Sequence, residues 1–184
     1  MGYALLILGL LAWSGSHLWK RLAPASRQGM GEAGKGIVTA ASLGGIVLMV
    51  LGYRWADAPV LWQGPAFLTH VNNLLMLLAF YLFAASGMKT AITRVIRHPQ
   101  LTAVKTWAVA HLLVNGSLAD VILFGGLLAW AVVSVILINR ANRDWTRPAP
   151  AGMAREAIAA GSAVVLLYLV GTLHAWLGVW PYGG

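Results

Sequence analysis

Histidine is the residue type in this chain that could bind a metal in an apolar environment. The sequence contains no cysteine and five histidines: His17, His70, His98, His111 and His174. Thiolate chemistry and disulfides are therefore excluded. Asp120 is the only acid near the interior of an apolar segment, so neither a carboxylate dyad nor an acidic metal cage is predicted. Neutral imidazole is a good axial ligand for haem iron, and an apolar helix bundle suits a haem pocket. Any one histidine could instead bond to a neighbouring carbonyl group, so both interpretations stay open.

The densest polar pattern lies in the segment from Trp107 to Asn115. Trp107, His111 and Asn115 recur every four residues. Because residues four apart share one face of a helix, we expect these three side chains to form a single polar and aromatic stripe. His111 is therefore a candidate ligand, with Trp107 and Asn115 as supporting residues.

The tripeptide Arg97-His98-Pro99 precedes that stripe. Proline disfavours helical geometry in the residue before it and suits the first helical position itself. His98 is therefore predicted at a helix N-terminus, beside Arg97. This helix N-terminus could bind an anion. Alternatively, it is only the start of a helix, with Arg97 as a positive charge at the membrane surface.

Composition determines which elements must position these residues. Hydrophobic residues make up 59% of the 184 residues and charged residues only 10%, against about 45–50% and 25% in soluble domains. The mean hydropathy is +0.74. A soluble globular protein, a disordered chain and a disulfide scaffold are excluded, because the few polar residues could not cover so much apolar surface. The chain is predicted to use lipid as its solvent.

Six apolar spans are predicted, in one all-α, multi-pass membrane domain that covers residues 1–184. A helix needs about 20 residues to cross the hydrocarbon core, so the fourth span is short unless it continues back toward Pro99. Ala41-xxx-Gly45 and Gly125-xxx-Ala129 have the spacing of small residues that lets helices approach closely. The spans are approximately Tyr3–Trp19, Ile37–Tyr53, Phe67–Ser86, Leu101–Val114, Leu118–Ile138 and Ala157–Trp176.

The positive charges predict the orientation of these spans. Twelve of the thirteen Lys and Arg residues follow the first, third and fifth spans, and the exception is Arg54. Because cytoplasmic loops are enriched in Lys and Arg, we expect both termini on the periplasmic side. The net charge of +8 is then explained by topology, and no nucleic-acid partner is expected.

Several stretches resemble the NnrU family over nearly the whole chain. The longest runs from Arg97 through His111 and Gly116 to Gly126, and shorter ones surround His17, Lys35 and His174. This resemblance implies an integral protein of the bacterial inner membrane that is linked to denitrification and nitric-oxide metabolism. It also implies a relationship to zeta-carotene isomerase, a membrane haem enzyme that isomerises the central cis double bond of zeta-carotene.

The resemblance implies haem b as cofactor, with His17 and His111 as its ligands. Ala108 stands where the plant enzyme has a cysteine. The implied function is a haem-dependent cis–trans isomerase of a carotenoid, or a denitrification-linked relative, with the bilayer and a lipophilic small molecule as partners. A non-catalytic accessory protein for nitrite or nitric-oxide reduction is the alternative. A membrane methyltransferase is the third interpretation. It ranks last because Asp144 and Glu156 stand apart and do not form the paired acids of those enzymes.

Depth in the membrane suggests other partners for His111. At 1.5 Å per residue, the α-carbon of His17 lies about 21 Å below the outer end of its span, and that of His111 about 6 Å below. The gap of about 15 Å exceeds the roughly 13 Å between the α-carbons of two histidines on one iron. His70 and His174 are at a depth similar to that of His111, so they are alternative ligands, as is His98.

Overall fold

The computed structural model describes residues 1–149 and 151–182. Pro150, Gly183 and Gly184 of the predicted domain lie outside the described residues. Helices make up most of the described part of the chain, and its only bridge between extended segments joins Val60 to Ser117. The predicted all-α fold is therefore confirmed.

The predicted spans correspond to helices that extend a few residues further. The helices are α1 (Gly2–Leu22), α2 (Pro24–Gly29), α3 (Gly31–Trp55), α4 (Leu68–Met88), η1 (Ala91–Arg94), α5 (Pro99–Val114), α6 (Leu118–Asp120), η2 (Val121–Gly125), α7 (Gly126–Ala141) and α8 (Met153–Trp176). The π-helix η2 joins α6 and α7 into one continuous rod of 24 residues.

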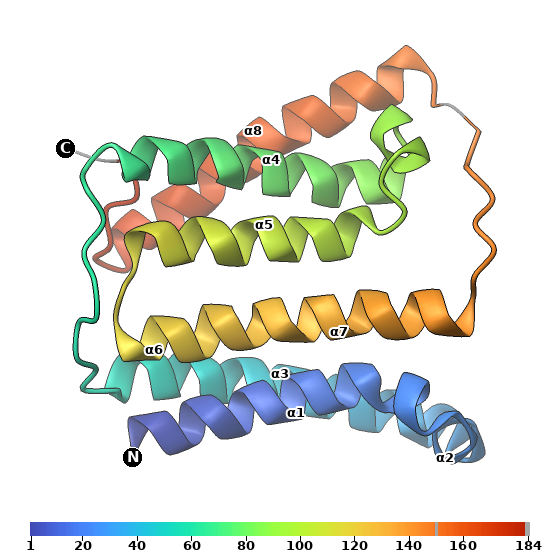
Figure 1. The fold of residues 1–184 in the computed structure, drawn as a ribbon, viewed down its shortest axis with the longest axis horizontal. Helices are drawn as coiled ribbons and strands as arrows, with labels where there is room; N and C mark the ends of the chain where they lie inside the picture. Colours follow the sequence, from blue (N-terminus) through green and yellow to red (C-terminus); the bar gives the residue numbers. More distant parts are fainter. Residues whose placement is uncertain (150, 183–184) are drawn as a thin grey trace.

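Five helices in the described part of the chain are long and apolar enough to cross a membrane: α1, α3, α4, the α6–α7 rod and α8. The multi-pass membrane fold is therefore confirmed. The helix α5 begins at Pro99, as the short fourth span required, but its 16 residues reach only about 24 Å. It runs beside α4 and α7 but is shorter than either the α4 helix or the α6–α7 rod (Figure 1). A sixth crossing, made by α5, stays a prediction.

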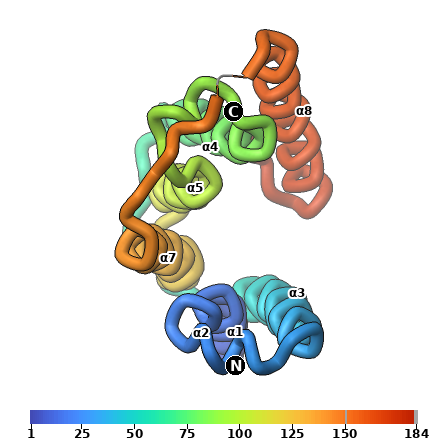
Figure 2. Tube along the Cα trace, turned by 90° about the vertical axis from the view of Figure 1, so that its right-hand side faces the viewer, coloured from blue at the N-terminus to red at the C-terminus, as the bar shows by residue number. Residues whose placement is uncertain are grey.

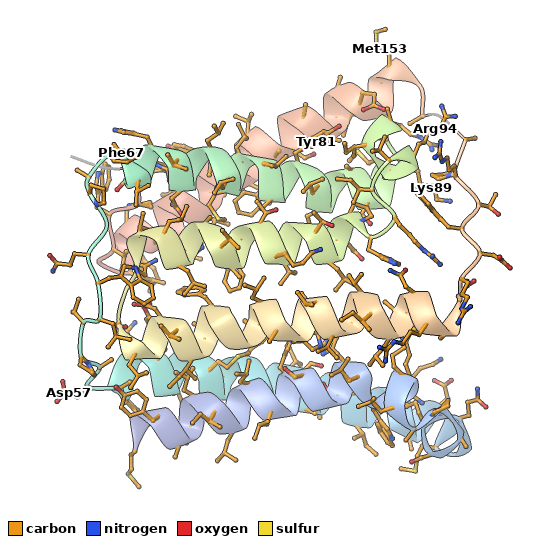
Figure 3. All side chains as sticks on the ribbon, viewed as in Figure 1. Asp57, Phe67, Tyr81, Lys89, Arg94 and Met153 are labelled. Atoms are coloured by element: carbon orange, nitrogen blue, oxygen red, sulfur yellow. The ribbon has the colours of Figure 1, made fainter. Side chains whose placement is uncertain are left out.

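The connections rich in Lys and Arg gather at one end of the bundle. The α1–α3, α4–α5 and α7–α8 connections lie together, opposite the α3–α4 and α5–α6 connections (Figure 1). Figure 3 shows Lys89 and Arg94 at the first end, and Asp57 and Phe67 at the other. This segregation is the one that the charge pattern predicts. The assignment of the termini to the periplasm stays a prediction.

The helix α7 lies between two groups of helices. Figure 2 shows α1 and α3 on one side of it and α4, α5 and α8 on the other. The closest packing joins α1 to α3, α4 to α5 and α8, and α5 to α7. His17 lies on α1 and His111 on α5, and both helices pack against α7.

Glycines bring the backbones of α1 and α3 together. A Cβ atom added at Gly9 would lie 2.6 Å from the Gly45 carbonyl oxygen, and one at Gly45 would lie 2.9 Å from the Gly9 carbonyl oxygen. The predicted packing role of Gly45 is confirmed. The same role for Gly125 is wrong, because a Cβ there would meet only Val121 of its own helix.

The neighbouring residue, Gly126, makes the close approach instead, against the Leu10 side chain of α1. The π-helix η2 precedes it and contains an extra residue in its turn. The close contact with α1 falls one residue after the glycine that the spacing of small residues indicated.

Candidate functional site

His111 lies on a stripe that α5 presents to η2 and α7. Its Nδ1 donates to the Trp107 carbonyl oxygen over 2.9 Å, and the Asn115 side-chain nitrogen donates to the His111 carbonyl oxygen over 3.0 Å. The imidazole stacks on Phe124, with ring centres 4.7 Å apart. The predicted common face of Trp107, His111 and Asn115 is therefore confirmed.

His174 and His111 line one cavity of about 210 Å³ between α4, α5 and α8. Asn72 and Trp107 contribute to its wall, and Tyr182 covers one side. Of the alternative partners for His111, the structure therefore brings His174 to the same cavity. His70 lies exposed near the start of α4 and lines neither this cavity nor the next.

A second cavity, of about 270 Å³, adjoins the first. The two share Met76, Phe80 and Trp107, and the second continues between the same helices toward Phe83 and Ala103. Every residue that lines it is apolar or aromatic. Together the cavities form a groove that is polar near the end of α5 and apolar along the rest of its length.

His17 belongs to a different cluster, between α1 and α7. Its ring centre lies 4.2 Å from that of Trp13 and 5.4 Å from that of Trp130. The indole nitrogens of both tryptophans are buried without a hydrogen-bond partner. Two unpaired donors beside one imidazole are unusual, because buried polar groups normally find a partner.

The rings of His17 and His111 are nearer in depth than their α-carbons. His17 packs on Trp130 and His111 on Phe124, and these two positions on the α6–α7 rod are about 9 Å apart along its axis. A helical side chain tilts toward the N-terminus of its helix. Because α1 and α5 run in opposite directions (Figure 1), the two side chains tilt toward each other.

The three histidines share one hydrogen-bond pattern. Nδ1 of each bonds to the carbonyl oxygen four residues earlier, over 2.8 Å for His17, 2.9 Å for His111 and 2.8 Å for His174. A carbonyl only accepts, so Nδ1 holds the proton and Nε2 has a free lone pair. This tautomer is the one required for metal ligation through Nε2. No cluster of three or more His, Cys, Asp or Glu that could hold a metal occurs among the described residues.

Arg97 and His98 hold the bundle end together. His98 precedes α5 as predicted, and its Nε2 bonds to the Asn139 side-chain oxygen over 2.8 Å. The Arg97 guanidinium donates to three successive carbonyl oxygens in the connection after α7, at residues 142–144. These side chains therefore join α5 to the end of α7, and their pattern differs from that of the three histidines.

The family model for NnrU protein matches residues 5–181. The chain belongs to the NnrU protein family. No curated protein and no solved structure matches this chain. The family match covers His17, His111 and His174.

Asp120 of this NnrU chain has a structural set of partners. It is 4% exposed. One oxygen accepts from the Tyr53 hydroxyl over 2.5 Å, and the other accepts from the Ser117 backbone nitrogen and hydroxyl over 2.7 and 2.6 Å. The carboxylate thereby ties α3 to the start of α6, with no oxygen left for a ligand.

The positions of Trp13 and Trp130 beside His17, and of Asn72 in the cavity wall, were not predicted from the sequence. Trp13 and His17 repeat the four-residue spacing of Trp107 and His111, so the pattern itself could have indicated a second aromatic–imidazole pair. No local signal could have placed Trp130 or Asn72, because each reaches its site only through packing between helices.

Proposed function

We propose that this NnrU protein is an integral membrane haem protein in which His17 and His111 bind haem b. The observation that carries the proposal is the shared hydrogen bond from Nδ1 to a carbonyl oxygen, which leaves Nε2 of each ring as a free ligand. The sequence resemblance selects these two histidines, and the bacterial inner membrane as their location.

Two features of the His17 cluster support the fit of such a group. Two imidazoles on one iron have ring centres about 6–7 Å apart, given Fe–N bonds near 2 Å. The two rings pack on positions of the α6–α7 rod that are about 9 Å apart along its axis, so haem binding would require the two helices to bring the rings closer. The unpaired indole nitrogens of Trp13 and Trp130 could donate to the carboxylates of a haem.

When bound, the haem would supply an iron that interacts with a lipophilic cis-polyene and lowers the barrier to rotation about its double bond. The protein would exclude water from the substrate and hold it. The groove between α4, α5 and α8, whose wall includes His111, supports the lipophilic character of that substrate. The denitrification-linked role and the accessory role use the same histidines with no isomerisation.

The methyltransferase alternative finds no support in the acids it would need. The Glu156 carboxylate accepts from the Ala91 backbone nitrogen over 2.6 Å. The backbone oxygen of Asp144 accepts from Arg97. The two acids have separate structural surroundings and form no pair that could bind a methyl donor.

The absorption spectrum of the purified protein, after haem-replete expression, tests the haem proposal. We expect a Soret band that is strongly reduced in His17→Ala and in His111→Ala. His70→Ala is the matched control, because His70 is exposed and lines neither cavity. Absence of the band in the wild type would refute haem binding. If the Soret band is lost in His174→Ala and retained in His17→Ala, the second haem ligand is His174 and not His17.

Expression in a carotenoid-producing host that is blocked at the central cis bond separates the enzymatic roles. Restoration of the downstream pigments by the wild type, and not by His111→Ala, is the result expected of an isomerase. An unchanged pigment profile with haem present would reject the isomerase and leave the denitrification-linked and accessory roles.

A further inference from the structure

One buried oxygen in the groove between α4, α5 and α8 has no hydrogen-bond partner. The Asn72 side chain is 8% exposed, and its nitrogen donates to the Asn73 side-chain oxygen over 3.3 Å. Its Oδ1 is buried without a partner, and Asn72 is one of the residues that line the cavity of about 210 Å³. Because leaving a buried acceptor unpaired costs about 1–3 kcal/mol, a ligand that donates a hydrogen bond would be favoured here.

A second free acceptor faces the same cavity from another helix. Nδ1 of His174 donates to the Val170 carbonyl oxygen, so Nε2 can only accept while the ring is neutral. The Tyr182 hydroxyl covers the cavity but donates to the Tyr168 carbonyl oxygen over 3.2 Å. Asn72 on α4 and His174 on α8 are therefore two acceptors that a single ligand with two donors could satisfy.

The remaining residues of the groove indicate the chemical nature of the rest of that ligand. Phe80 and Trp107 line both cavities and offer flat aromatic surfaces. At roughly 30 Å³ per water-sized group, the first cavity has room for one hydroxylated ring. The adjoining cavity of about 270 Å³ has an apolar wall, which suits an apolar tail.

We propose that this groove is a binding site for a membrane-soluble quinol, a dihydroxylated ring with an apolar tail. One ring hydroxyl donates to Asn72 Oδ1 and the other to His174 Nε2, while the tail lies against Phe80 and Phe83. A phospholipid phosphate does not fit the polar end, because an ionised phosphate only accepts. An oxidised quinone does not fit for the same reason. The site uses His174 and neither His17 nor the Nε2 of His111, so it is separate from the pair of ligands proposed for haem.

Binding of a decyl-substituted benzoquinol to the full chain in nanodiscs tests this proposal. The comparison ligand is the dimethyl ether of the same quinol, which has the same ring and tail but no donor. Both are titrated under dithionite, which keeps all components reduced, and binding to empty nanodiscs is subtracted. We expect the quinol to bind roughly three- to tenfold more tightly than its ether, as the loss of one or two hydrogen bonds implies.

Two variants and a matched control locate the site. Asn72→Leu and His174→Phe should each weaken quinol binding roughly three- to tenfold and leave ether binding unchanged, and Asn72→Leu should also leave haem content unchanged. Thr172→Val is the control, since Thr172 is exposed on α8 and bonds only within its own helix. Equal affinity for quinol and ether, or wild-type quinol affinity in both variants with an intact helical spectrum, would overturn the proposal. A quinol preference in protein that lacks a Soret band would refute the haem proposal alone.

Discussion

Replacement of Gly9 by alanine should loosen the contact between α1 and α3. A Cβ atom at Gly9 would lie 2.6 Å from both the Gly45 carbonyl oxygen and the Met49 backbone nitrogen. Ordinary contacts of this kind begin at 3.4 Å, so the helices must separate by about 0.8 Å or more. Backbone atoms cannot move aside as a flexible side chain can, and such overpacking typically costs about 1–3 kcal/mol.

Gly15→Ala is the matched comparison, because it lies on the same helix and its added Cβ meets nothing within 4 Å. Both substitutions gain the helix preference of alanine over glycine, about 0.5–1 kcal/mol. We therefore expect Gly15→Ala to be neutral or stabilising, and Gly9→Ala to be about 1–3 kcal/mol less stable than Gly15→Ala.

Thermal unfolding followed by circular dichroism, in one detergent and at one protein concentration, measures the difference. For a chain of this length, 1 kcal/mol corresponds to roughly 2–4 °C in Tm. Because α1 also holds His17, Gly9→Ala should lower haem content if the haem proposal holds. Equal Tm values for the two variants would refute the inference that α1 and α3 pack backbone to backbone at this point.

The remaining predictions concern the buried carboxylate and the topology. Tyr53→Phe removes the hydroxyl that donates to Asp120 and should destabilise the fold by about 1–3 kcal/mol. Tyr3→Phe is the control, because it loses only an exposed hydrogen bond and should change Tm little. Equal losses of Tm in the two variants would contradict this prediction. The chain has no cysteine, so Gly29→Cys and Asp57→Cys provide single labelling sites at opposite ends of the bundle. In intact cells, a membrane-impermeant maleimide should reach the cysteine at 57 but not the one at 29, and the reverse pattern would invert the topology.

The membrane fold was predictable because its causes are local in sequence. Long apolar segments form helices in lipid, where backbone polar groups must bond within their own segment. The clustering of Lys and Arg after alternate spans likewise predicted which connections gather at one end, as Figure 1 shows. The stripe of Trp107, His111 and Asn115 followed from helical periodicity alone. The face that α7 presents to α1 did not, because Gly126 and not Gly125 meets Leu10, and the spacing of small residues does not show which of two adjacent glycines faces a neighbouring helix.

The sequence by itself determined that histidine would carry any ligand chemistry, and that four of the five histidines would lie inside apolar helices. Only the tertiary structure decided their neighbours, because helix spacing says nothing about which faces of separate helices meet. The packing of α8 on α4 brings His174 to the cavity of His111 and Asn72. The packing of α1 and α5 on the α6–α7 rod places the His17 ring against Trp130 and the His111 ring against Phe124.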